Sequence, residues 1–232
     1  MAIREISSYH LGDMLLVFEE ETEFHRVGFY MIPWSMQKDR VLDRKFYRIN
    51  SLAQVKIAGD MYPNCYGNGQ TMRNGESANR MDYKSQREVA TECGKEIHTY
   101  FEDARGYELE NVITYYHGED SFEMKNIFTN KAEKKVSLEM LSSFEMGDIS
   151  PFLEGIGTDA LLVHRLRSKW SHEGRLVTET VEDLQLEPSW SNWSVGVERF
   201  GQRGVYAGYE IFPICGSRRF CQSHRVGCPA GS

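Results

Sequence analysis

Apolar and polar residues alternate with a period of two along much of this chain, and this pattern limits the possible folds most. The segment KVSLEMLSSF places apolar residues at Val136, Leu138 and Met140, and SFEMKNIF places Phe122 and Met124 two residues apart. Such alternation is typical of β-strands that bury one face and expose the other to water. The pattern therefore indicates strands rather than helices.

Further segments are rich in β-branched and aromatic residues or repeat the alternation. They are KFYRINSLAQVKIA, ELENVITYYHG, ALLVHRL, RLVTETV and WSVGVERF. Helical periodicity is poor, and only VEDLQLE, residues 181–187, is expected to make a short turn before Pro188. Several strands separated by polar turns favour an antiparallel sandwich. We predict an all-β fold, a large antiparallel β-sandwich with little helix, over residues 1–200.

Composition excludes several function classes. Hydrophobic residues make up 41% of the 232 residues, which is enough for a folded core. The formal net charge of −7 gives no general attraction for nucleic acid or for an anionic membrane. The N-terminus has no signal-peptide pattern, and no apolar run approaches the roughly 20 residues of a membrane span. We expect a cytoplasmic protein without nucleic-acid or membrane partners.

The cysteines and the C-terminal residues bear on disulfides, metal binding and the end of the folded domain. Five irregularly spaced cysteines give no disulfide framework, which agrees with a reducing compartment. After residue 200 the chain has a single acid, and we predict that residues 201–232 are an atypical tail, either a natural basic terminus or an out-of-frame product. Thiol and imidazole groups in the tail suit zinc, but no short C-x2-C pair is present, and the alternative is a disordered tail with free thiols. The residues concerned are Cys215, Cys221, His224 and Cys228. We predict no metal and no cofactor.

The segment YPNCYGNGQTMRNG, residues 62–75, is the strongest loop signal in the chain. Glycine, asparagine and proline fill half of it, and aromatic residues and an arginine flank them. Long loops of this kind are functional or disordered more often than they are without a role. The candidate ligand contacts are Tyr62, Asn68, Gln70 and Arg73. The alternative is an ordinary surface loop.

Tryptophans with polar neighbours add a second hint of ligand binding. Aromatic faces stack on sugar rings while amide and guanidinium groups bind hydroxyls. Trp170 is our further candidate for sugar contact, although a core position is the alternative for it; Trp34 and Trp190 also have polar neighbours, and Trp193 fits a core position better. Acids near predicted turns offer material for a glycosidase pair, but a solvated acidic surface explains each of them. These acids are Glu102, Asp103, Glu119, Asp120 and Asp148.

Several of these segments resemble one known family. KKVSLEMLSSFEMG, LVHRLRSKWSHEGRL and ITYYHGEDSFEMKNIFTNKAEKKVSLE are similar to strands of the N-terminal domain of glycoside hydrolase family 36, the α-galactosidases, and YPNCYGNGQTMRNG stands where that family has a Tyr-Pro loop with glycines, an acid and an arginine. The resemblance covers about residues 10–200. Gln70 stands where the family pattern has the acid, which is a departure from it.

The resemblance implies a β-supersandwich that shapes a sugar pocket, in some members that of a neighbouring subunit, beside a catalytic (β/α)8 barrel. It implies that this chain is truncated before the barrel, so that the catalytic residues of the family have no counterpart here and its own remain unknown. A slip of the reading frame near Gly201 is our hypothesis for this truncation, which the nucleotide sequence tests. Loss of the barrel would expose an apolar surface, so we expect a homo-oligomer.

Two functions stay open at this point. One is a non-catalytic, carbohydrate-associated domain of an α-galactosidase-like glycoside hydrolase, with a galactoside-like ligand. The other is a stand-alone glycoside hydrolase whose new active site is built on the isolated sandwich and acts in an oligomer. Fold analogy carries most of this reasoning, and a fold does not fix a function.

Overall fold

A computed structural model of the chain describes residues 3–37, 49–62, 74–147, 161–167, 174–186 and 211–217. The elements are β1 (Ile3–Leu11), β2 (Met14–Glu21), β3 (Arg26–Pro33), η1 (Trp34–Met36), β4 (Val55–Ile57), α1 (Glu76–Asn79), β5 (Asp82–Ala90), β6 (Gly94–Asp103), β7 (Tyr107–Tyr116), β8 (Phe122–Asn130), β9 (Leu138–Leu141), β10 (Leu161–Arg167), β11 (Arg175–Thr180) and β12 (Ile211–Ser217). The chain divides into two compact units, residues 1–64 with 73–152, and residues 65–72 with 153–232. No helix among the described residues is long and apolar enough to cross a membrane.

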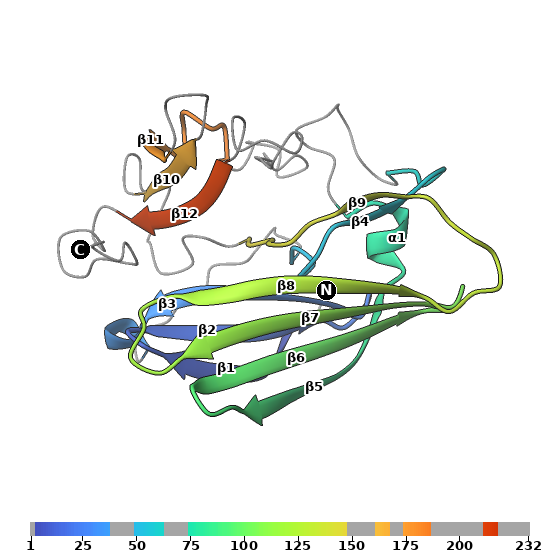
Figure 1. The fold of residues 1–232 in the computed structure, drawn as a ribbon, viewed down its shortest axis with the longest axis horizontal. Coiled ribbons are helices and arrows are strands. Elements are labelled where there is room, and N and C mark those ends of the chain that lie inside the picture. Colours follow the sequence, from blue (N-terminus) through green and yellow to red (C-terminus); the bar gives the residue numbers. More distant parts are fainter. Residues whose placement is uncertain are drawn as a thin grey trace. The chain divides into compact units, whose positions relative to one another are not determined.

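Strands β5, β6, β7 and β8 form an antiparallel four-stranded sheet in chain order, drawn in green in Figure 1. Ile97 of β6 pairs with Ile113 of β7, and Ile113 pairs with Met124 of β8. These apolar side chains share the inner face, because facing residues in a ladder project to the same side. Residues between them, such as His98 and Thr114, project outward, so the alternation seen in the sequence separates a core face from a wet face.

Strands β1, β2 and β3 form a second antiparallel sheet of the first unit. Strand β2 lies in the middle, and its apolar run is buried on both faces of the sheet: Leu16 and Phe18 belong to the main core, and Leu15 and Val17 to a separate cluster with Tyr30 and Ile32. A strand that is buried on both sides needs a continuous apolar run rather than alternation.

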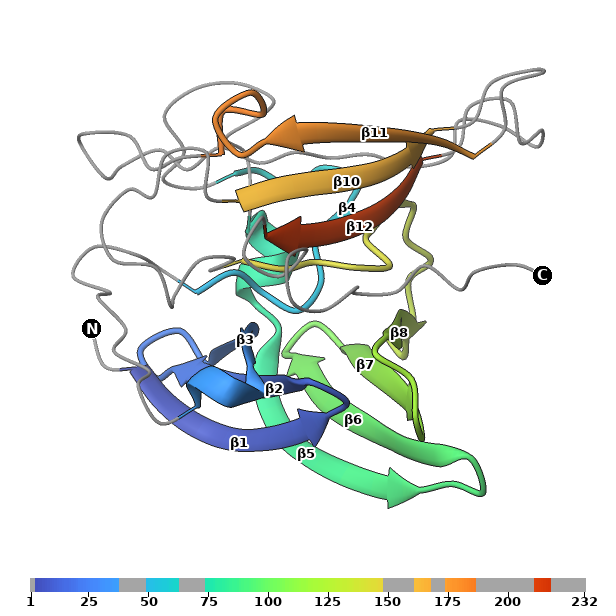
Figure 2. The same ribbon diagram turned by 90° about the vertical axis from the view of Figure 1, so that its left-hand side faces the viewer.

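The main core lies between these two sheets, which Figures 1 and 2 show lying against each other. Phe29 of β3 meets Phe122 of β8 edge to face, with ring centroids 6.3 Å apart, and Phe18 lies 5.8 Å from Phe29. Edge-to-face aromatic pairs at this separation are favourable beyond their area burial. The first unit is therefore a β-sandwich.

A smaller pair of strands, β4 and β9, joins the sandwich to the predicted loop. Val55 of β4 pairs with Leu141 of β9, and beyond the pair the Gln54 amide donates to Ser142 Oγ at 2.8 Å. The single-turn helix α1 lies next to β4, as Figure 1 shows. The described part of the loop, at residues 62, 74 and 75, therefore lies between β4 and α1 in the chain.

The second unit contains an antiparallel sheet with the order β11-β10-β12. Val163 of β10 pairs with Glu179 of β11 on one side and with Cys215 of β12 on the other. The buried Arg165 side chain forms an ion pair with Glu179. This sheet brings together segments that are far apart in the sequence.

The predicted all-β antiparallel fold with little helix is confirmed. Strands are present in ELENVITYYHG, SFEMKNIF, KVSLEMLSSF, ALLVHRL and RLVTETV, and turns follow at residues 181–185. Within KFYRINSLAQVKIA only Val55–Ile57 is a strand in the described part, and residues 51–54 are buried outside any strand although the Leu52 amide donates to the Val27 carbonyl oxygen. WSVGVERF lies outside the described residues. The boundary at residue 200 stays a prediction for the same reason.

Candidate functional site

The two ends of the 62–75 loop are held together by short backbone contacts. The Glu76 amide donates to the Met61 carbonyl oxygen at 2.8 Å and joins the two ends, while the Asn79 amide donates to the Gly75 carbonyl oxygen at 2.9 Å within the turn of α1. A Cβ at Gly75 would lie 3.3 Å from Cε1 of Tyr62, tighter than an ordinary contact. The residues that flank the loop, Met61 and Tyr62 on one side and Gly75 and Glu76 on the other, therefore lie next to each other.

Asn74 fixes the return of the chain. Its φ of 51° lies in the left-handed region, where asparagine is among the few non-glycine residues commonly found. Its buried Oδ1 accepts from Ser51 Oγ at 3.1 Å and from Gln54 Nε2 at 3.0 Å, and its amide donates to Gln54 Oε1 at 2.7 Å. The Asn79 side chain also donates to the Asn74 carbonyl oxygen. These bonds satisfy the polar groups of Asn74 that burial removes from water.

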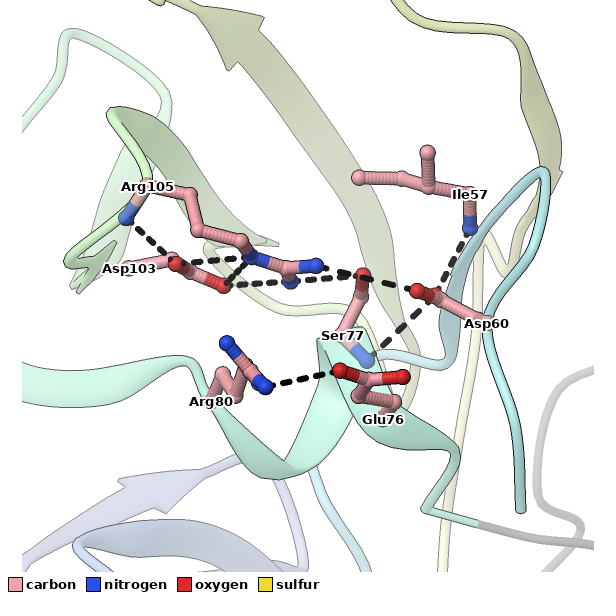
Figure 3. A network of polar contacts seen from close by, with 7 residues as sticks. All are labelled: Ile57, Asp60, Glu76, Ser77, Arg80, Asp103 and Arg105. Carbon is pink, nitrogen blue, oxygen red and sulfur yellow. Dashed lines mark hydrogen bonds and ion pairs between the residues drawn. The ribbon is translucent and has the colours of Figure 1, made fainter.

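A second polar network fixes the departing chain, and Figure 3 shows its members. One oxygen of Asp60 accepts from the Ile57 amide at 2.9 Å and from the Ser77 amide at 3.3 Å. The Arg105 guanidinium lies 3.7 Å from the other Asp60 oxygen and donates to Ser77 Oγ at 2.8 Å. Asp60 thus links β4, α1 and the turn between β6 and β7.

Arg105 is itself held by Asp103. Its guanidinium donates to both Asp103 oxygens, the shortest contact being 2.6 Å, and its own amide donates to Asp103 Oδ1 at 2.7 Å. The hydrogen bond to Asp103 raises the pKa of Arg105 above its ordinary value. The side chains of Asp103 and Asp60 are 1% and 5% exposed, so both carboxylates serve as acceptors in a structural network rather than as open reacting groups.

The solvent side of the loop base carries fewer fixed groups. Lys56 of β4 forms an ion pair with Glu139 of β9, and this contact raises the pKa of the Lys56 ammonium. Tyr62 is half-buried, whereas Met61 is 73% exposed. The arrangement supplies a rigid base and a partly exposed aromatic side chain, which suits ligand contact by the loop.

The structure tests only part of the predicted binding set. Tyr62 lies at the loop base as described, while Asn68, Gln70, Arg73 and Trp170 lie outside the described residues. Trp34, which we weighed as a core or a sugar-binding residue, is 36% exposed and stacks on His10 with ring centroids 3.7 Å apart. It is therefore a surface aromatic residue.

The remaining candidates are described only in part. Asp103 is buried in its ion pair with Arg105, and Asp148 lies outside the described residues. Of the four tail residues weighed as zinc ligands, Cys215, Cys221, His224 and Cys228, only Cys215 falls in the described part, in β12. Across the described ranges, no group of three or more His, Cys, Asp or Glu side chains is arranged to hold a metal ion.

Sequence reasoning missed the residues that anchor the loop. Ser51, Gln54 and Asp60 lie within or beside a segment interpreted as strand, and nothing in the spacing pairs them with Asn74. The Asn74-Gly75 dipeptide was a usable signal, because Asn-Gly marks positions that need a positive φ. No family model, curated protein or solved structure matches this chain.

Proposed function

We propose that the chain is a carbohydrate-associated domain, similar in role to the N-terminal domain of an α-galactosidase-like glycoside hydrolase. The observation that supports this best is the loop base. Buried hydrogen bonds at Asn74 and Asp60 pin both ends of a polar, aromatic-edged loop to a β-sandwich. A pinned base lowers the entropy that a loop loses when it binds a ligand.

The chemistry of the loop favours a sugar as the ligand. Tyr62 offers an aromatic face, and Asn68, Gln70 and Arg73 offer amide and guanidinium groups for hydroxyls. Gln70 replaces a carboxylate by a neutral amide, so we expect binding to be weak and to need no titrating acid. The resemblance to family 36 points to a galactoside-like ligand.

Calorimetric titration of the whole chain with methyl α-galactoside tests the proposal. We expect millimolar binding, weakened about tenfold by Arg73→Ala, which corresponds to about 1.4 kcal/mol. Lys131→Ala is the matched control, because it removes a cation from the exposed turn after β8. Absence of binding to α- and β-galactosides alike, in a chain that is folded by circular dichroism, would refute the proposal.

The hydrolase alternative has its own test. A panel of nitrophenyl glycosides, run on the purified chain with and without a chelator, measures turnover directly. Activity that co-purifies with the chain would replace the non-catalytic proposal by the alternative. Substitution of each acid around the loop base would then locate the catalytic pair.

A further inference from the structure

The outer face of the four-stranded sheet carries a groove that the loop proposal does not involve. Its volume is about 390 Å³, within the range of small-molecule sites. Outward side chains of all four strands of this sheet line it. They include Ser85, Arg87, Tyr100, Glu108, Glu110 and Thr129. We call this feature the outer-face groove.

Strand register explains why these side chains meet. Tyr100 of β6 pairs with Ser85 of β5 on one side and with Glu110 of β7 on the other. Glu110 in turn pairs with Ile127 of β8. Directly opposed residues project to the same face, so one row of side chains crosses all four strands.

Hydrogen bonds hold the polar members of the groove and its rim in place. Arg87 donates to the Tyr100 hydroxyl oxygen through Nε at 3.0 Å and Nη2 at 2.7 Å. His98 Nδ1 lies 2.7 Å from Glu110 Oε1, and His98 Nε2 lies 3.0 Å from Glu96 Oε2. The side chains are therefore ordered before any ligand arrives, which reduces the entropy cost of binding.

Each carboxylate of the groove already has a cationic or imidazole neighbour. Glu108 pairs with Lys131 at 2.5 Å, and Glu102 lies 3.9 Å from Lys84. Glu110 has His98. The cations Lys84, Arg87 and Lys131 thus stand near three carboxylates, which leaves little net charge to attract a strongly charged ligand. Phosphate groups would meet three carboxylates.

Apolar surface is present but limited. Ile127 is 43% exposed and the ring of Tyr100 is half-buried, and Glu110 lies between these two residues in the cross-strand row. The centres of protein–protein interfaces are depleted in charged residues, whereas this groove is rich in them. A macromolecular partner that buries the whole face would have to desolvate every ion pair, which is costly.

We propose that the outer-face groove binds a neutral, hydroxyl-rich ligand, a carbohydrate chain, at a site separate from the 62–75 loop. Carboxylate oxygens accept from sugar hydroxyls, while the Arg87 guanidinium and the Ser85 and Thr129 hydroxyls donate to sugar oxygens. The side chains of Tyr100 and Ile127 offer apolar contacts to the faces of sugar rings along the chain. This proposal goes beyond the function of the loop and stands without it.

An NMR titration of the ¹⁵N-labelled whole chain tests this inference. The probes are cellohexaose, maltohexaose and mannohexaose, with a sulfated hexasaccharide as the charged comparison. We expect at least one neutral probe to shift the amide signals of Ser85, Tyr100, Glu110 and Thr129, and to bind more tightly than the sulfated one. Absence of shifts at these residues with every neutral probe at about 10 mM, or tighter binding of the sulfated probe, overturns the proposal.

Substitutions separate the groove from the loop. Tyr100→Ala should weaken binding at least tenfold, whereas Tyr116→Ala should not, because Tyr116 is exposed on the outer face of the same sheet but does not line the groove. Thr129→Trp places a bulky ring over the groove at an exposed position and should block binding without affecting folding. Unchanged affinity in a folded Thr129→Trp chain overturns the proposal.

The failure of one proposal can be told from the failure of the other. Arg73→Ala is expected to weaken binding of methyl α-galactoside and to leave the shifts at Ser85 and Tyr100 unchanged. If Arg73→Ala abolishes those shifts, the separate groove site is refuted. If it leaves both ligands bound, the loop proposal alone fails.

Discussion

The two sheets of the sandwich are built from similar strands but bury their faces differently. In the three-stranded sheet, Leu16 and Phe18 face the main core, and Val17, Tyr30 and Ile32 on the other face are also fully buried or nearly so. The four-stranded sheet has a core on one face only, and its outer face carries charged and polar side chains. Residues on both faces of the three-stranded sheet are buried, whereas the four-stranded sheet has one buried face and one solvent-exposed face.

This difference changes what a charged residue means in each sheet. Glu21 and Arg26 in the three-stranded sheet are 0% and 5% exposed, and their ion pair is removed from water. The Glu108–Lys131 pair of the four-stranded sheet is open to solvent, with side chains 36% and 63% exposed. Buried pairs are costly to break, whereas surface pairs contribute little.

The largest expected effect comes from breaking the buried ion pair. Arg26→Met leaves Glu21 buried without the guanidinium that lies 3.0 Å away, and should lower the free energy of unfolding by about 3–5 kcal/mol. Lys131→Met, the matched surface variant, should lower it by less than about 1 kcal/mol. Urea denaturation measures both. Equal losses would show that the two sheets do not differ in this way.

A pair of isoleucines gives the next largest contrast. Ile32 is 0% exposed on the second face of the three-stranded sheet, and Ile127 is 43% exposed on the outer face of the other. Ile32→Ala should cost about 2–5 kcal/mol, because it leaves a cavity, and Ile127→Ala about 1 kcal/mol or less. Thermal unfolding measures the loss of unfolding free energy for both variants. A small loss for Ile32→Ala would mean that this face is not a packed core.

The smallest effect concerns pH. Burial alone would raise the pKa of Glu20, but hydrogen bonds from Arg4 and His25 outweigh it and hold the pKa below its ordinary value of 4.5. For Glu110, burial acts in the same direction, and hydrogen bonds with His98 and Tyr100 again lower the pKa. Carboxylates with lowered pKa stabilise the fold above about pH 4.5, and this stability is lost as pH falls through the lowered pKa.

Glu20→Gln and Glu110→Gln should therefore each flatten the decline of the unfolding free energy below about pH 5. We expect the larger change for Glu20, whose side chain is 5% exposed against 26% for Glu110. Denaturation at a series of pH values measures the slopes. A steeper decline in either variant would contradict the expected sign.

Sequence patterns predicted strands of the four-stranded sheet better than those of the three-stranded sheet. Alternation in ELENVITYYHG and SFEMKNIF corresponds to β7 and β8, because one face of that sheet is wet. No strand was predicted at the apolar run Met14–Phe18, although it lies in β2, a strand buried on both sides. A continuous apolar run has no period of two, so alternation could not find it.

The candidate site was predictable only in its most local part. Glycine and asparagine marked the loop, and Tyr62 lies at its edge. The anchoring contacts join Asn74 to Ser51 and Gln54, and Asp60 to Arg105. Such contacts depend on how β4, α1 and the β6–β7 turn come together, and a single sequence carries no direct record of that packing.

The closed base of the 62–75 loop also has a consequence for how this chain can change over evolution. The Glu76 amide bonds to the Met61 carbonyl oxygen, so the two chain segments that flank the loop are held together at its base. Each doubling of loop length costs only about 0.6 kcal/mol in closure entropy. A change in the number of residues between Met61 and Glu76 therefore costs little closure entropy, and we expect the bond at the base to hold the flanking segments in place while the loop sequence varies.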